Sequence, residues 1–165
     1  MKFLHLVLVS LWVGGAISLN LMIFCLGPAT SGPELYGYNL ACVLVDDLAI
    51  IPGALGSLLT GLLISGLTPW GFFKHRWVTI KWILTIFCIL FGTFFLGPTV
   101  NGQPPISEEY GLAALNDPQY VANWLNSLIG GLFQMLALFF MLAISVLKPW
   151  RKFPRNQAAN SLLNP

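Results

Sequence analysis

Four long apolar runs constrain this chain more than any other feature. They cover residues 3–26, 48–67, 77–96 and 124–147. Each run approaches the roughly 20 residues that a helix needs to cross about 30 Å of hydrocarbon. Only 8% of the residues are charged, whereas a soluble domain carries about a quarter. The sequence therefore predicts an all-α integral membrane protein with four spans in a single domain, surrounded by lipid and without a nucleic-acid partner.

Prolines indicate where the spans end. Each run stops at or just before a proline, at Pro28, Pro69, Pro98 and Pro149. Proline has no N–H to donate and biases the residue before it away from helix, so it favours a stop. The segments between the spans are then predicted to be two outer loops, residues 27–47 and 97–123, and a tail at 148–165.

The charges separate cleanly between the two sides of the predicted bundle. The acidic residues all fall on the side of the outer loops: Glu34, Asp46, Asp47, Glu108, Glu109 and Asp117. The basic residues fall on the other side: Lys2, Lys74, Arg76, Lys148, Arg151, Lys152 and Arg155, with Lys81 just inside the membrane. Basic residues gather on the cytoplasmic side of membrane proteins. Both termini are therefore predicted to be cytoplasmic.

Two pairs of segments match each other and suggest an internal duplication. Residues 24–32 match residues 94–102 at five of nine positions, and both contain Leu-Gly-Pro. Residues 65–73 and 145–153 share Ser, Leu, Pro-Trp and Phe. Two duplicated helical hairpins of the same orientation are related by a pseudo-twofold axis along the membrane normal. The predicted architecture is a four-helix bundle of this kind.

Small and polar residues mark helix contacts in lipid, because lipid supplies no hydrophobic force between helices. Three stripes of such residues are expected to face the interior: Ser10, Gly14 and Ser18; Gly53, Gly56, Ser57, Thr60 and Gly61; and Asn126, Gly130 and Gln134. The amides of Asn20 and Gln134 are costly at depth unless they find partners. We expect them to form hydrogen bonds between helices, with a substrate contact as the alternative.

The candidate chemistry gathers at the cytoplasmic end, where His5, His75 and Lys81 fall. If the duplication holds, the two histidines lie at equal depth. A histidine there could ligate haem or a metal ion. A lysine inside the membrane either extends to the headgroups or pairs with an anion such as a haem propionate. The alternative is that these residues only anchor their helices at the interface.

Asp46 and Asp47 open the second predicted span. Acids at a helix N-terminus complement the helix dipole and cap free N–H groups. The alternative is a site at which a cation or proton enters the membrane domain.

Short motifs in three of the four spans resemble small bacterial membrane families. Leu4-His5, followed by Trp12-Val-Gly-Gly15, resembles the first helix of an uncharacterised group of integral membrane proteins, of the copper-resistance D proteins and of four-helix protoporphyrinogen oxidases. Thr60-Gly-Leu62 is similar to an element of the first two families, and Trp77-x-x-x-Lys81 is similar to one in the oxidases. The uncharacterised group is the nearest resemblance.

The resemblance to the oxidases implies haem b, with His5 and Lys81 tied to its binding, and a location in the bacterial inner membrane. The long outer loops depart from the compact oxidase pattern. The leading hypothesis is therefore a haem-b oxidoreductase with its site near the cytoplasmic face. The alternatives are a non-catalytic accessory subunit, bound to a membrane partner or to a second copy, and a metal-handling or transport protein.

Overall fold

The structure, a computed structural model, describes residues 1–25, 29–67 and 76–147, and the elements it shows there are helices. In chain order they are α1 (Lys2–Cys25), α2 (Gly32–Val45), η1 (Asp46–Ile50), α3 (Ile51–Leu67), α4 (Arg76–Phe91), η2 (Gly92–Leu96), α5 (Gly97–Asn101), α6 (Gln103–Tyr110), η3 (Gly111–Asn116) and α7 (Pro118–Leu147).

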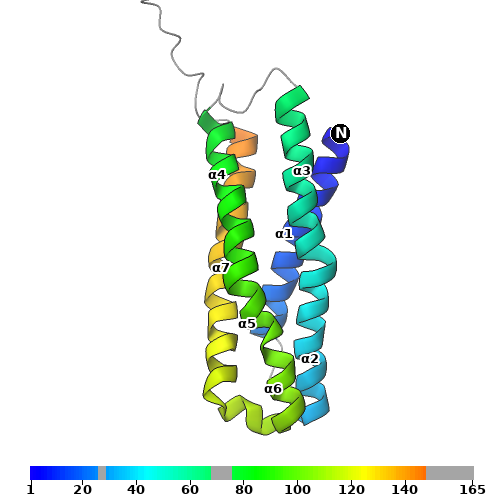
Figure 1. Ribbon diagram of the computed structural model, residues 1–165, viewed down its shortest axis with the longest axis vertical. Helices are drawn as coiled ribbons and strands as arrows, with labels where there is room; N and C mark the ends of the chain where they lie inside the picture. Colours follow the sequence, from blue (N-terminus) through cyan, green and yellow to red (C-terminus); the bar gives the residue numbers. More distant parts are fainter. Residues whose placement is uncertain (26–28, 68–75, 148–165) are drawn as a thin grey trace, which may run out of the picture.

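These elements form four rods that lie side by side along one axis (Figure 1). The first rod is α1, the second runs from α2 through α3, the third runs from α4 through η3, and the fourth is α7. Each rod contains a stretch long and apolar enough to cross a membrane, which confirms the prediction of an all-α chain with four candidate spans. The rod α1 packs on α3 and α7, α7 also packs on α4 and α5, and α2 packs on α6. The start of α1 and the end of α7 lie at the same end of the bundle (Figure 1).

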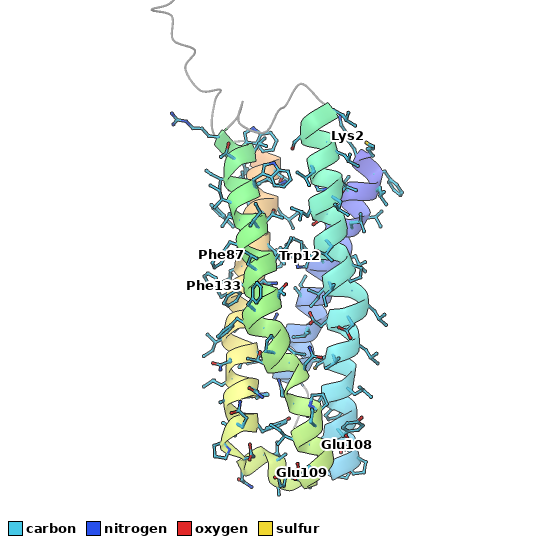
Figure 2. The ribbon with its side chains drawn as sticks, viewed as in Figure 1. Lys2, Trp12, Phe87, Glu108, Glu109 and Phe133 are labelled. Carbon is cyan, nitrogen blue, oxygen red and sulfur yellow. The ribbon has the colours of Figure 1, made fainter. Side chains whose placement is uncertain are left out.

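The charges divide along this axis as the sequence predicts. Lys2 lies at one end and Glu108 and Glu109 at the other (Figure 2). We call these the basic end and the acidic end. The internal duplication, the pseudo-twofold axis and the cytoplasmic location of the termini stay predictions, and the tail at 148–165 lies outside the described residues.

The outer loops predicted at 27–47 and 97–123 are wrong in large part, because most of these residues are helical. α2 covers Gly32–Val45, and α5, α6 and η3 together carry helix from Gly97 to Asn116. Pro33 and Pro104 fall in the first turns of α2 and α6. At that position the missing N–H is one that a helix start leaves unpaired anyway.

Two π-helical turns let the second and third rods continue past their prolines. In η1 the N–H of Ile51 donates to the carbonyl of Asp46, and in η2 the N–H of Gly97 donates to the carbonyl of Gly92. Each turn is followed two residues later by a proline, Pro52 or Pro98. A proline ring collides with the carbonyl four residues earlier. That carbonyl lies inside the wider turn in both rods, so the helix absorbs the proline without ending.

A close backbone contact joins α1 to α3. A Cβ added at Gly53 would lie 2.6 Å from the main-chain nitrogen of Trp12. A Cβ at Gly15 would lie 2.9 Å from Cγ1 of Ile50. Only glycine allows backbones to come this close. The two contacts also fix the antiparallel register of the two rods.

The interior faces agree with the predicted stripes on one helix and differ on two. Gly53, Ser57 and Thr60 are buried as predicted. On α1 the predicted stripe is exposed (Ser10, Gly14 and Ser18), and the buried face carries Trp12, Ala16, Leu19 and Asn20 instead. On α7 Asn126 is exposed, whereas Gly130 and Gln134 are buried. A large side chain packed against a glycine fills the space between two helices as well as two small side chains do. Small residues alone therefore did not identify the buried face of each helix.

Buried hydrogen bonds join the rods at the acidic end. Asn39 Nδ2 donates to Ser107 Oγ at 2.9 Å, and the Tyr120 hydroxyl donates to Asn39 Oδ1 at 3.2 Å. These bonds connect α2, α6 and α7.

The 36-residue second rod is about 54 Å long at 1.5 Å per residue, well beyond the roughly 30 Å of a hydrocarbon core. The second rod is therefore longer than the hydrocarbon core is thick.

We predict that Gly53→Ala destabilises the bundle by about 1–3 kcal/mol, the usual cost of overpacking a fitted site. The added methyl group would collide with the main chain of Trp12, which has no room to move. Thermal unfolding of the purified protein in one detergent would measure the change. Gly14→Ala is the matched control, because a Cβ at Gly14 meets nothing within 4 Å. Equal unfolding temperatures for the two variants would contradict the prediction.

Candidate functional site

A cavity of about 540 Å³ lies among the four rods. Its walls come from α1, η1, α3, α4, η2, α5 and α7. Binding sites for small organic molecules usually have volumes of about 300–1,000 Å³. The cavity is therefore large enough for a molecule of that class, and apolar side chains form most of its wall.

Three buried polar atoms on this wall have no hydrogen-bond partner in the described part of the chain. They are Trp12 Nε1, Asn20 Oδ1 and Gln134 Oε1, and all three residues line the cavity. Their side chains are at most 5% exposed. Burying such a group without a partner costs several kcal/mol, so three on one cavity wall call for an explanation. Figure 2 shows Trp12 between the α1–α3 pair and the α4–α7 pair.

The orientation of the Asn20 amide is fixed by its own helix. Nδ2 of Asn20 donates to the carbonyl of Ala16 at 2.8 Å, which leaves Oδ1 as a free acceptor. A Cβ added at Gly131 would lie 2.8 Å from this oxygen, so α7 approaches Asn20 only because it has glycine there. The interhelical hydrogen bonds predicted for Asn20 and Gln134 are wrong within the described residues, since Asn20 bonds its own helix and Gln134 bonds none of them.

The cavity reaches the surface between α3 and η2. Ile51 and Leu55 of α3 line it and are 45% and 47% exposed. Thr93 of η2 also lines it and is exposed. Both rods belong to candidate spans. The opening therefore faces sideways, toward the lipid, and does not lie at an end of the bundle.

The predicted site residue His5 lies nearer the basic end, against α3. Its Nδ1 is 2.8 Å from the hydroxyl oxygen of Thr60, and that hydroxyl donates its one proton to the carbonyl of Gly56 at 2.7 Å. The hydroxyl can also turn its proton to Nδ1, so this contact is compatible with either tautomer of the ring. In the tautomer that donates from Nδ1, the neutral imidazole has its lone pair on Nε2, a form in which a histidine binds a metal or accepts a proton.

The structure also brings Lys81 toward His5. A Cβ at Gly61 would lie 3.6 Å from Cε1 of His5 and 3.9 Å from Cη2 of Trp82, so α1, α3 and α4 converge at this level. Lys81, beside Trp82, is half-buried and close enough for its charge to act on the imidazole. It forms no ion pair with the described residues. His75 lies outside the described residues, so its predicted equal depth with His5 stays untested.

Metal ligands do not gather anywhere in the described ranges: no group of three or more His, Cys, Asp or Glu side chains is found there. Comparison of the chain with protein-family models, with curated proteins and with solved structures finds no match in any of the three. The site must therefore be interpreted from its own geometry.

The amides of Asn20 and Gln134 were predicted to form hydrogen bonds between helices, with a substrate contact as the alternative, and both residues line the cavity. Trp12 was not predicted to lie with them. The usable signal was spacing, because Trp12 and Asn20 are eight residues apart and so share a face of one helix.

We predict that Gln134→Leu leaves the stability of the unliganded protein unchanged or raises it. An apolar group of similar size replaces an amide whose oxygen has no partner, which removes a desolvation penalty. Ser127→Ala on the same helix should instead cost about 1 kcal/mol, because Ser127 Oγ accepts from Gln103 Nε2 and donates to Thr99 Oγ1. Unfolding by sodium dodecyl sulfate would compare them. A larger loss for Gln134→Leu would show that Gln134 already has a structural partner.

Proposed function

We propose that this integral membrane protein binds a lipid-soluble molecule with hydrogen-bonding groups in the cavity among its four rods. One observation carries the proposal: Trp12 Nε1, Asn20 Oδ1 and Gln134 Oε1 are buried without described partners, and all three residues line one cavity. An apolar cavity with a few convergent polar groups is the usual form of a small-molecule site.

The unpartnered atoms specify what kind of molecule fits. Trp12 offers an N–H donor, and Asn20 offers a carbonyl acceptor. The Gln134 amide is not tied to a described residue and can present either end. A hydrocarbon alone would leave all three groups unpaired. The cavity therefore favours a molecule that has an apolar body and both donor and acceptor groups.

The sideways opening is consistent with a ligand that arrives through the bilayer. The exposed lining residues Ile51, Leu55 and Thr93 lie on rods that are apolar enough to contact lipid. A ligand dissolved in lipid reaches this opening without passing through water, so an apolar body carries no desolvation cost on entry.

We predict that a diazirine derivative of decanol labels cavity residues when the protein is reconstituted in nanodiscs and illuminated. Peptide mass spectrometry should find adducts on buried lining residues such as Leu19 and Cys88, and excess decanol should suppress them. Leu55→Trp, which places a bulky ring at the opening, should reduce them about tenfold, equivalent to about 1.4 kcal/mol of binding. Leu59→Trp is the control, since Leu59 is exposed on the same helix and does not line the cavity.

Adducts confined to lipid-facing residues and unaffected by Leu55→Trp would refute the proposal, because they would show that the probe samples only the outer surface.

The geometry at His5 favours a second candidate function, haem-b binding by a membrane oxidoreductase. When Nδ1 carries the proton in its hydrogen bond with Thr60, Nε2 has the lone pair that an axial ligand needs. Half-buried Lys81 supplies a positive charge that would suit a haem propionate. A bound haem would supply one-electron chemistry. The residues of this chain would hold the imidazole in one tautomer and neutralise the carboxylate.

For this second candidate we predict a Soret absorption band in protein purified from haem-supplemented cells, and its loss in His5→Ala. Lys81→Met should weaken haem retention without abolishing the band, because it removes a charge and no iron ligand. His75→Ala would test the third predicted residue in the same way. A colourless wild-type preparation from haem-supplemented cells would eliminate this candidate and leave the cavity proposal unaffected.

A further inference from the structure

The cavity carries one charged group, and the group is acidic. Of the 21 described residues that line it, six are polar: Asn20, Asp46, Thr93, Asn101, Ser127 and Gln134. Asp46 is the only one of the 21 with a charged side chain. It forms no hydrogen bond or ion pair with the described residues. Asp46 is half-buried, and a carboxylate without a counter-charge is costly in an apolar setting.

The register of the rods places one free carbonyl oxygen level with this carboxylate and a second one a turn away. Gly15 contacts Ile50, and the rods are antiparallel, so five residues farther along α1 Asn20 lies level with the start of η1, where Asp46 is. Asn20 also contacts Gly131 on α7, and Gln134 lies one turn from Gly131 on that helix, toward the basic end. Asp46, Asn20 and Gln134 therefore supply acceptors from three rods along one stretch of the cavity wall.

The other end of the cavity is apolar apart from one indole. Trp12 lies level with Gly53, which is seven residues after Asp46 and so about 10 Å away along the axis. Ala16, Ala54 and Cys88 form the wall near Trp12. The cavity therefore has an anionic, acceptor-rich part and an apolar part, separated by about the length of a medium-sized organic molecule.

We infer that the ligand is a lipophilic ammonium ion with N–H groups, such as a primary or secondary amine on an apolar body. This inference rests on the proposed function and specifies its ligand class. The ammonium would neutralise Asp46 and donate to the oxygens of Asn20 and Gln134, so that each of its protons meets an acceptor. The apolar body would extend toward Trp12, and an acceptor group on it would pair with the indole N–H. An inorganic cation would leave the apolar part of the cavity unfilled.

The experiment compares three probes of equal chain length in nanodiscs of phosphatidylcholine, which has no net charge. Decylamine carries the charge and the N–H groups, decyltrimethylammonium carries the charge alone, and decanol carries neither. Equilibrium dialysis against empty nanodiscs measures saturable binding. We expect decylamine to bind about tenfold more tightly than decanol, a difference of about 1.4 kcal/mol, with decyltrimethylammonium between them.

Asp46→Asn should remove the preference for decylamine over decanol. Asp47→Asn is the matched control, because Asp47 is the adjacent acid and does not line the cavity. Should Asp46→Asn fail to fold, Gln134→Leu is the second variant, and it should weaken decylamine more than decyltrimethylammonium, which has no N–H to lose a partner.

The outcomes separate the inference from the proposed function. Equal affinities for decylamine and decanol, or a preference that persists in Asp46→Asn, would overturn the inference of an ammonium ligand while the cavity remained a binding site. No saturable binding of any probe above that of empty nanodiscs would count against the proposed function as well.

Discussion

The contact between the backbones of α1 and α3 at Trp12 and Gly53 determines most of the interior. With no side chain on Gly53, the main chain of α1 comes within van der Waals distance of α3. The contact fixes the register in which Asn20 lies level with Asp46 and His5 meets Thr60. Both candidate sites, the cavity and the site at His5, therefore depend on one close contact between α1 and α3.

The two π-helical turns have a further effect on the cavity. An extra residue in a turn rotates the rest of the rod by about 100° relative to an uninterrupted helix. η1 places Asp46 and Ile50 on the cavity wall, and η2 places Gly92 and Thr93 there. The prolines just after these turns give a local reason for the wider geometry, and the wider turns supply residues on one wall. Helix geometry and site composition are thus coupled through Pro52 and Pro98.

The number of candidate spans, their apolar character and the separation of charge were predictable from the sequence, because these depend on composition along the chain. Helix in the outer segments was not predicted. Pro33, Pro98 and Pro104 look the same in sequence whether they start a helix or end one, and only the neighbouring rods decide. The inner face of α1 was missed because Trp12 is buried opposite a glycine on another rod, a pairing that no local pattern reveals.

The contacts of Asn20 and Gln134 in the candidate site could not be predicted from the sequence either. Their cost at depth was evident from the sequence, but what meets them depends on distances between rods. Asn20 turns its N–H back onto Ala16 in its own helix, and Gly131 of α7 packs against the oxygen that is left free. His5 and Lys81 were predicted to gather at one end of the bundle, and the packing of α1 and α4 around α3 brings their helices together there.

The lateral opening between α3 and η2 affects the fraction of protein molecules whose cavity is filled by ligand. A molecule that enters from lipid meets the protein at its concentration in the membrane, which exceeds its concentration in water by its partition coefficient. A modest intrinsic affinity can then fill the cavity at low aqueous concentrations. The composition and fluidity of the surrounding membrane become part of the binding equilibrium, and the same protein would be occupied to different extents in two membranes that dissolve the ligand unequally.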